Sequence, residues 1–368
     1  MQDVDFGYSF PAIRGIQAGR EFYVTQFPLS MISKVLSFDD SDLPPEMRAQ
    51  RVLNSQRVPE MADYVLANRD DYIFSALTAS VDADVAFDSV GGSTSDQIGM
   101  LRIPMSARFV VNDGQHRRAA IAEALHHDPS LRHETIAMVL FLDRGLERSQ
   151  QMFADLNRHA IRPSSSIGIL SDHRDPLAAV TREFVSRLDW LHDVVEVEKT
   201  TMAPRSRKLF TLSALFNGTK ALLSGLDLDA DQQIQLGCDF WDGIGSGFPE
   251  WRAVHERRVS SADLRSEFIS THGLVLHAFG SLGNALVRDQ GDVDWGAVGT
   301  RLGELDWRRN NSQLWEGRAL QAGRVQKGYQ NVQLTTNVLK EHLGLTLSDE
   351  EQSLEKAFES GRRRQKHG

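Results

Sequence analysis

Residues 109–125 read FVVNDGQHRRAAIAEAL, and this stretch decides the fold of the first part of the chain. Its first three residues form a short apolar run typical of a buried strand. Asn112, Asp113 and Gly114 follow as a strong turn signal. Beyond them, apolar residues recur at helical spacing between 120 and 125, among good helix formers. The stretch therefore predicts a strand, a tight turn and a helix in direct succession.

Around this stretch, the first 145 residues mix short strands with helices. Runs of β-branched and aromatic residues bounded by glycine or proline indicate the strands, and a proline suited to a first turn indicates a helix start. We expect a strand over residues 20–28, a helix that begins near Pro59, a strand within 72–85, a loop over 91–99 and a strand over 135–143.

From Leu146 onward, apolar residues recur at helical spacing almost throughout. Ser348 followed by Glu351 is the signature of a capping box, which predicts the start of the last helix at this point. The chain then ends in the basic tail GRRRQKHG. The pattern predicts an α+β protein, with an α/β domain over residues 1–145 and a mostly helical domain over residues 146–368.

The composition is that of an ordinary globular protein, with 368 residues of which 41% are hydrophobic and 25% are charged. No apolar run approaches the ~20 residues that span a bilayer, and the first residues lack the basic and apolar regions of a secretion signal. The single cysteine, Cys238, excludes an internal disulfide and suits a reducing compartment. We therefore expect a cytoplasmic protein without a membrane segment.

The DGQHR turn, residues 113–117, is the best candidate for a binding site. A strand that leads through a polar turn into a helix exposes N–H groups at the positive end of the helix dipole, which favours an anion such as phosphate. Arg117 and Arg118 fall in the first turn, where the dipole disfavours cations unless a bound anion neutralises them. Gly114 would let the backbone approach a ligand, and Asp113 could hold a divalent metal or orient a water. The structural alternative is a common turn in which Asp113 caps the helix.

In this strand–turn–helix setting, the motif resembles the signature of the DGQHR-domain proteins, which include the DndB family of bacterial DNA phosphorothioation systems. The resemblance extends through MFADLNRHAIRPSSS (residues 152–166), SDHRD (171–175) and WEGRALQAGRVQKGYQNVQLTTNVLKEHLGL (315–345), so it spans most of the chain. The motif region is also similar to the nucleotide box of the ParB/sulfiredoxin superfamily, in which a Gly-x-x-Arg turn holds a nucleoside triphosphate. These likenesses imply a ParB/sulfiredoxin-like fold for the α/β domain.

The resemblance also implies a cofactor, namely a nucleoside triphosphate (ATP or CTP) bound with Mg²⁺ that Asp113 would hold. Sulfiredoxins carry a catalytic cysteine in this turn where the chain has Gln115, and Cys238 lies far along the helical part, so sulfinic-acid repair is not expected. The implied catalytic residues are Asp113, Gln115 and His116. The implied nucleotide-binding residues are Asp113, Gly114, Gln115, His116, Arg117, Arg118, Asn157 and Arg158.

Asn157 and Arg158 belong to a second polar block, which also holds Asp155 and continues at residues 172–175. These polar residues are close together in the sequence and could form a second side of the nucleotide site. The structural alternative stays open, because arginines at helix ends often bond main-chain carbonyls. Asp172 would in that case only cap the helix that follows.

Two basic stretches are candidate DNA contacts in spite of the formal net charge of −9, because phosphate contacts depend on local charge. Residues 199–208, KTTMAPRSRK, carry basic side chains and no acid, and indicate an exposed loop. The later stretch interleaves basic residues with Trp307, Trp315 and Tyr329, which suits phosphates and unpaired bases, although such tryptophans are more often core residues. The candidate DNA-binding residues are Lys199, Arg205, Arg207, Lys208, Arg318, Arg324 and Lys327.

The favoured hypothesis is a DNA-binding accessory or regulatory protein of DNA phosphorothioate modification, with a nucleotide site and with NTP hydrolysis or DNA nicking as its activity. The alternative is a transcriptional regulator of the modification genes without nucleotide chemistry. The expected partners are double-stranded DNA and the sulfur-transfer enzymes of the modification system, and a homo-oligomer stays open. The 12 histidines lack the paired spacing of a zinc site, so Mg²⁺ is the metal we expect.

Overall fold

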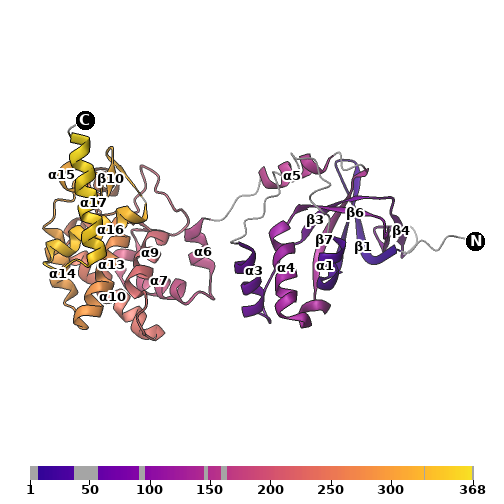
Figure 1. Ribbon diagram of the computed structural model, residues 1–368, viewed down its shortest axis with the longest axis horizontal. Coiled ribbons are helices and arrows are strands. Elements are labelled where there is room, and N and C mark those ends of the chain that lie inside the picture. Colours follow the sequence, from indigo (N-terminus) through magenta and orange to yellow (C-terminus); the bar gives the residue numbers. More distant parts are fainter. Residues whose placement is uncertain are drawn as a thin grey trace, which may run out of the picture. The chain divides into compact units, whose positions relative to one another are not determined.

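The computed structural model describes residues 7–36, 57–90, 96–144, 148–158, 164–326 and 328–366 (Figure 1). The chain divides into two compact units, Met1–Ile161 and Arg162–Gly368, which we call the sheet unit and the helical unit. A mixed sheet with helices in the first unit, followed by a second unit made almost entirely of helices, confirms the predicted α+β class. The domain boundary predicted after residue 145 falls before helix α5 (Ser149–Arg158), which packs on strand β6 (Arg108–Asp113) of the sheet unit.

The sheet unit is built on one seven-stranded sheet with the strand order β4-β5-β1-β2-β7-β3-β6. All neighbouring pairs are antiparallel except β3 and β7, which run parallel. Strand β6, which leads into the DGQHR turn, therefore lies at one edge of the sheet beside β3. The other strands are β1 (Gly7–Gln17), β2 (Arg20–Pro28), β3 (Leu77–Asp82), β4 (Ala86–Ser89), β5 (Ile98–Pro104) and β7 (Thr135–Leu142).

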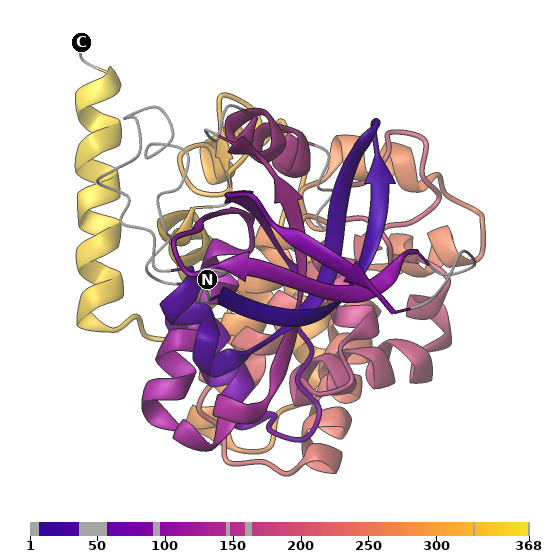
Figure 2. The same cartoon turned by 90° about the vertical axis from the view of Figure 1, so that its right-hand side faces the viewer.

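Strands β1 and β2 form a long hairpin, drawn as two indigo strands in Figure 2. Ala18 and Gly19 join them, with φ angles of 53° and 73°. Two consecutive positive φ angles are the geometry of the tight turn that suits the twist of antiparallel strands. A two-residue turn thus sets the register of the hairpin, in which Gln17 pairs with Arg20.

Most sheet-unit elements predicted from the sequence are confirmed. The predicted strands over 20–28, within 72–85 and over 135–143 are β2, β3 and β7. The strand, turn and helix of the DGQHR stretch are β6, Gly114 and helix α4 (Gln115–His127). The helix expected near Pro59 is α3, which begins at Arg57. Of the predicted loop over 91–99, residues 91–95 lie outside the described residues, and Ile98 and Gly99 instead begin β5.

Helices cover one face of this sheet (Figure 1). Phe27, Leu77 and Ile121 are at most 2% exposed in the core between sheet and helices. Along β6, side chains alternate between the two faces, so Val110 and Asn112 point away from that core, and α5 packs on them. The helices on the core side are α1 (Leu29–Val35), α3 (Arg57–Ala67), α4 and the short η2 (Pro129–His133).

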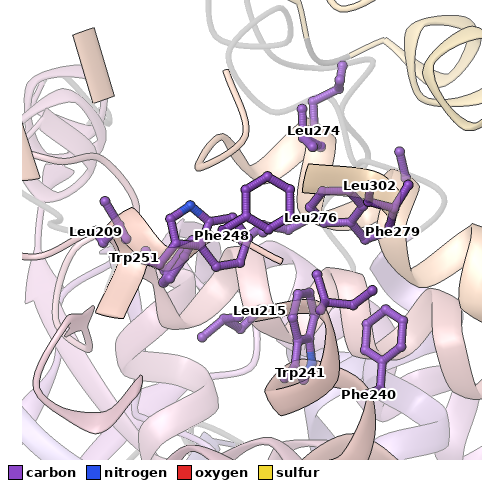
Figure 3. Packing of buried hydrophobic residues seen from close by; sticks show 14 of the residues in the cluster. Leu209, Leu215, Phe240, Trp241, Phe248, Trp251, Leu274, Leu276, Phe279 and Leu302 are labelled. Atoms are coloured by element: carbon purple, nitrogen blue, oxygen red, sulfur yellow. The ribbon is translucent and has the colours of Figure 1, made fainter. Parts of the chain in front are cut away.

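The helical unit is organised around helices α9 and α13, which pack along each other. Its core is rich in aromatic side chains, and Figure 3 shows Phe248 stacked on Trp251, with ring centroids 4.3 Å apart. All 6 tryptophans of the chain lie in this unit, and their large apolar area explains how helices of modest length form one core. The elements are α6 (Ser165–Ser171), α7 (Pro176–Arg187), α8 (Asp189–His192), β8 (Val195–Glu196), β9 (Phe210–Thr211), α9 (Leu212–Leu223), α10 (Ala230–Ser246), α11 (Pro249–His255), α12 (Ser261–Glu267), α13 (Gly273–Gln290), α14 (Trp295–Gly303), α15 (Ser312–Trp315), β10 (Leu320–Gln321), β11 (Arg324–Val325), α16 (Tyr329–His342) and α17 (Asp349–Lys366).

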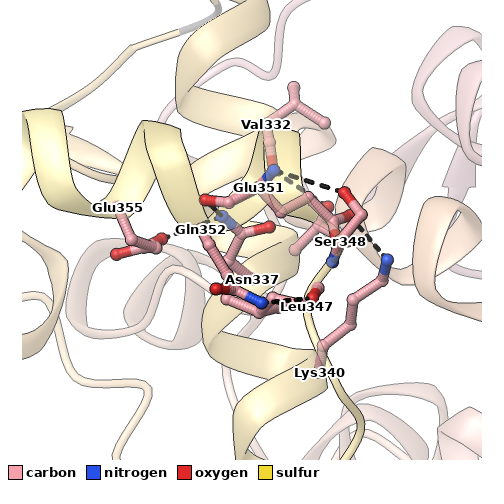
Figure 4. A network of polar contacts seen from close by, with 9 residues as sticks. Val332, Asn337, Lys340, Leu347, Ser348, Glu351, Gln352 and Glu355 are labelled. Carbon is pink, nitrogen blue, oxygen red and sulfur yellow. Dashed lines mark hydrogen bonds and ion pairs between the residues drawn. The ribbon is translucent and has the colours of Figure 1, made fainter.

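The last helix begins at the predicted capping box (Figure 4). The backbone N–H of Ser348 donates to Glu351 Oε2 at 2.9 Å, and the Glu351 N–H donates to Ser348 Oγ at 3.3 Å. This reciprocal pair satisfies donors that a helix start would otherwise leave without partners, so the predicted capping box is confirmed. Helix α17 continues into the basic segment as far as Lys366.

The longest of the described helices, α13 and α17, have 18 residues each. In the described part of the chain, no helix combines the length and the apolar character that crossing a membrane requires.

Candidate functional site

Just before the DGQHR turn, three buried polar side chains are linked by hydrogen bonds. Asn112 Nδ2 donates to Ser80 Oγ at 2.7 Å, and Ser149 Oγ donates to Asn112 Oδ1 at 2.8 Å. All three side chains have no exposed area. Buried polar groups are stable only when they are hydrogen-bonded. These hydrogen bonds therefore hold the end of β6 against β3 and against the start of α5. These hydrogen bonds were not predicted from the sequence, although a polar residue directly after an apolar run, Asn112 after residues 109–111, was a signal for them.

The turn itself requires glycine. Gly114 has a φ angle of 100°, a left-handed conformation that other residues adopt only at a cost. A Cβ atom at this position would lie 2.3 Å from Leu77 Cδ2. Gly114 is the N-cap of α4 and provides no side-chain cap, so the alternative in which Asp113 caps this helix is wrong.

Arg117 is the centre of the turn's polar contacts. Its Nη2 lies 2.8 Å from Asp113 Oδ2, one helical turn away, and its Nη1 donates to Ser75 Oγ. The Arg117 side chain is 18% exposed and that of Asp113 is 47% exposed. The Nε of Arg117 is buried and has no hydrogen-bond partner among the described residues. Gln115 Nε2 donates to Val111 O at 3.2 Å, so the turn folds back on its own strand.

The structure brings most of the predicted nucleotide-binding residues together. The side chains of residues 113 and 115–118 are half-buried around the start of α4, and the first turn of this helix contains no acidic residue. The main-chain N–H of Arg118 donates to Gly114 O at 2.9 Å, which begins the helix. Asn157 and Arg158 are the last two residues of α5, and their side chains lie outside what the structure describes.

The residues of the turn fit a phosphate group better than a metal ion. A buried guanidinium N–H that lacks an acceptor, a glycine N-cap and a helix N-terminus are features that suit an anion. Asp113 is the one carboxylate of the turn, and Arg117 already engages it. Among the residues described, no group of three or more His, Cys, Asp or Glu side chains is placed to hold a metal. Mg²⁺ would therefore need oxygen ligands from a bound nucleotide.

The block at residues 172–175 has structural roles. Asp172 Oδ1 accepts the main-chain N–H groups of Arg174 at 2.9 Å and Asp175 at 3.0 Å, and these hydrogen bonds lower the pKa of Asp172. The cap of the following helix is Asp175, whose Oδ1 accepts the Leu177 N–H at 2.8 Å. The prediction that Asp172 caps this helix is therefore wrong by three residues.

The basic loop, residues 199–208, lies between β8 and β9 of the helical unit. Lys199, Arg205 and Arg207 are exposed, which confirms the predicted exposed loop, whereas Lys208 is half-buried and its Nζ donates to Asp193 O at 2.9 Å. Arg265 of α12 donates to main-chain carbonyls of this loop and holds it in place. That the loop contacts DNA stays a prediction.

Arg318, a candidate DNA contact, is buried in an ion pair. Its guanidinium lies 2.7 Å from Glu355 Oε2, with both side chains 11% exposed, and 4.5 Å from the centre of the Phe358 ring. A buried cation that a carboxylate already neutralises has little attraction for a phosphate, so the structure does not support Arg318 as a DNA contact, and this assignment stays a prediction. Trp307 and Trp315 are core residues, at 4% and 0% exposed. Arg324 is exposed in β11, and Lys327 lies outside the described residues.

Comparison with known proteins agrees with these features. Over residues 10–346, which include most of both units, the chain matches the model of a family described as DNA-sulfur modification-associated. The chain belongs to the DndB family. This confirms the resemblance drawn from the DGQHR motif and gives the protein a role in DNA sulfur modification. No curated protein and no solved structure shows a significant match.

Proposed function

We propose that the protein binds DNA in the course of DNA sulfur modification and binds a nucleotide at the DGQHR turn. The observation that carries the nucleotide site is the Nε of Arg117, a buried donor without an acceptor among the described residues. A buried unsatisfied donor is unfavourable, and a phosphate oxygen is the acceptor that best suits a guanidinium. A phosphate at this position would also lie at the positive end of the α4 dipole.

Each residue of the turn has a proposed role. Gly114 lets the phosphate approach the backbone, because there is no Cβ at this position. Arg117 exchanges part of its contact with Asp113 for the phosphate, and Arg118 adds positive charge nearby. Gln115 and His116 are the candidates for orienting a water if the nucleotide is hydrolysed, and Asp113 for contacting Mg²⁺ that the nucleotide carries. DNA nicking would be a further activity of the same site.

The proposed DNA contact is the basic loop of the helical unit. Lys199, Arg205 and Arg207 are exposed there, and the ten residues of the loop contain no acid. The chain as a whole has a formal net charge of −9, so most of its surface repels phosphates and the footprint has to be local. DNA affinity should therefore fall steeply as the salt concentration rises.

The test is a calorimetric titration of the full chain with ATP and with CTP in the presence of Mg²⁺, with phosphate release followed with and without double-stranded DNA. We expect saturable binding that falls at least about tenfold in Arg117→Gln, because a charge-assisted hydrogen bond is lost. Arg132→Gln is the matched control, since Arg132 is an exposed arginine of the same unit whose side chain, among the described residues, bonds a local carbonyl, Pro129 O. Equal affinity in the two variants would rule out the turn as the nucleotide site.

A second candidate is a DNA-binding regulator without nucleotide chemistry. The observation in its favour is that Asp113 and Ser75 already satisfy both terminal nitrogens of Arg117. In this case the turn would be structural or would contact DNA phosphate. The discriminating result is a wild-type chain that binds neither ATP nor CTP, together with an Arg117→Gln chain that has lost DNA affinity.

A further inference from the structure

The helical unit contains a cavity of about 660 Å³ whose wall combines apolar and polar side chains. Its walls come from the basic loop, from β9 and the first half of α9, from α12 and from the start of α13, and Ser165 of α6 and Val332 of α16 also line it. The volume lies in the range of about 300–1,000 Å³ that is usual for sites of organic ligands. A cavity of this size accepts a molecule much larger than a single inorganic ion.

The charge of the cavity wall is positive. Among its lining residues, all within the described part of the chain, there is no Asp, Glu or Lys. Arg265 is the permanently charged residue, and its guanidinium donates to three main-chain carbonyls of the basic loop, including those of Ala203 and Pro204 at 3.1 Å. Carbonyl oxygens satisfy its hydrogen bonds without cancelling its charge. Burial lowers the pKa of Arg265, which shows that the charged form is partly desolvated and would gain from an anionic neighbour.

A second arginine, Arg309, adds positive charge through its contact with a residue that lines the cavity. Arg309 Nη2 lies 2.8 Å from Nε2 of His272, which lines the cavity. Arginine can only donate, so Nε2 of His272 is the acceptor and Nδ1 carries the ring proton. The guanidinium of Arg309 also donates to the main-chain carbonyls of Ser266, Gly323 and Arg265. The guanidinium groups of Arg265 and Arg309 are thus both held by neutral acceptors, and that of Arg309 contacts residues of the cavity wall.

Buried hydroxyl groups also line the cavity. Thr211, Ser213 and Thr271 are 9%, 8% and 6% exposed. The Oγ1 of Thr271 is buried and has no hydrogen-bond partner among the described residues. A buried hydroxyl without a partner is unfavourable, so an acceptor of a ligand that reached Thr271 Oγ1 would stabilise the complex. Met202, Leu209 and Leu274 contribute apolar surface beside these hydroxyls, which suits the body of an organic molecule.

From these features we propose that the cavity binds a small phosphorylated organic molecule of about mononucleotide size. Its phosphate lies toward Arg265 and Thr271, and its organic body lies against Met202, Leu209 and Leu274. This site is separate from the DGQHR turn, because all of its lining residues belong to the helical unit. The proposal does not depend on nucleotide binding at the turn.

The experiment is calorimetric titration of the full chain with adenosine 5′-monophosphate, with adenosine as the uncharged comparison. We expect adenosine 5′-monophosphate to bind, and adenosine to bind at least about tenfold more weakly because it lacks the charged group. Thr271→Val should weaken the binding of the monophosphate by about tenfold, since it removes one hydrogen bond to a charged ligand. Arg265→Gln should weaken it further.

The matched control is Thr335→Val. Thr335 of α16 is fully buried, and its Oγ1, like that of Thr271, lacks a partner in the described part of the chain, but Thr335 does not line this cavity. Both valine variants should keep the wild-type tryptophan fluorescence, because all 6 tryptophans report on the helical unit. Thr335→Val should bind the monophosphate like the wild type. Equal binding by the two valine variants would overturn the proposal.

The same titration is repeated in Arg117→Gln, so that the two proposed sites are distinguished. Binding that persists in Arg117→Gln and weakens in Thr271→Val supports the cavity. Binding that disappears in Arg117→Gln and is unchanged in Thr271→Val belongs to the DGQHR turn and overturns the cavity proposal alone. Absence of any binding, or equal binding of adenosine and its monophosphate, also overturns the cavity proposal.

Discussion

The two candidate sites of this molecule differ in what holds their arginines. In the DGQHR turn, a carboxylate lies 2.8 Å from the guanidinium of Arg117. In the cavity of the helical unit, the guanidinium of Arg265 donates to main-chain carbonyls and pairs with no carboxylate among the described residues. A carboxylate cancels the charge of the cation, whereas a carbonyl satisfies its hydrogen bonds and leaves the charge in place. The comparison teaches that the partner of an arginine decides whether it can attract an anion, more than its place in a basic stretch does.

Arg318 is the extreme case of a neutralised arginine and gives the largest expected effect. Glu355→Gln removes the carboxylate from a pair in which both side chains are 11% exposed. It leaves a buried cation without its counter-charge, so we expect the helical unit to lose about 3 kcal/mol of its free energy of unfolding. Urea unfolding followed by tryptophan fluorescence measures this unit alone, because all 6 tryptophans belong to it.

The control for this variant is Glu183→Gln in the same unit. Glu183 pairs with Arg187 on the surface of α7, and the two side chains are 47% and 51% exposed. Such a pair contributes at most about 0.5 kcal/mol. If both variants shifted the unfolding midpoint equally, the pair of Arg318 with Glu355 would be no more stabilising than a surface pair. Arg318 would then be as plausible a DNA contact as the exposed arginines.

The second prediction concerns the backbone of the DGQHR turn. Gly114→Ala forces a Cβ into a left-handed residue and to within 2.3 Å of Leu77 Cδ2. We expect the sheet unit to lose about 2 kcal/mol of its free energy of unfolding, while the fluorescence transition of the helical unit stays unchanged. Far-UV circular dichroism follows the loss of the sheet unit.

Gly19→Ala separates the two causes of that loss of stability, the left-handed backbone conformation and the close contact with Leu77. Gly19 also has a positive φ angle, of 73°, but a Cβ there would meet nothing within 4 Å. This variant should cost about 1 kcal/mol, which is the conformational part alone. A Gly114→Ala chain no less stable than Gly19→Ala would show that the contact with Leu77 does not constrain the turn.

The sequence predicted what is local and missed what is assembled from distant segments. The strand, turn and helix around Gly114 could be predicted, because turn chemistry and helical spacing act over a few residues. The strand order β4-β5-β1-β2-β7-β3-β6 could not be predicted, since several neighbouring pairs, such as β2 with β7, join strands from distant parts of the chain. The same reason hid the contact of Arg318 with Glu355, 37 residues further on, and the cavity, whose walls span residues 165–332. In a basic stretch, the sequence does not show which arginines are already neutralised.

The third prediction tests the exposed arginines of the basic loop. Arg205→Ala and Arg207→Ala should each lower the slope of log affinity against log salt by about 1 on double-stranded DNA, and should weaken binding severalfold at low salt. Arg187→Ala is the control, because Arg187 is an exposed arginine of the same unit that Glu183 already pairs. Equal salt slopes for all three variants would show that the loop does not contact DNA phosphates. Filter-binding at a series of salt concentrations measures these slopes.

The smallest expected effect on stability comes from Asp113→Asn, and this variant bears most directly on the comparison. Asp113 is 47% exposed, so losing its pair with Arg117 should change the free energy of unfolding by less than about 1 kcal/mol. The same change replaces the carboxylate beside Arg117 by a neutral amide, so the charge of Arg117 is no longer cancelled, as is already the case for Arg265. If the turn binds a nucleotide phosphate through Arg117, the affinity for ATP should therefore rise severalfold, both with Mg²⁺ and with a chelator. If Asp113 instead acts as a metal ligand, the affinity should fall in Mg²⁺ and stay unchanged with the chelator, and the turn would have to be described as a metal–nucleotide site.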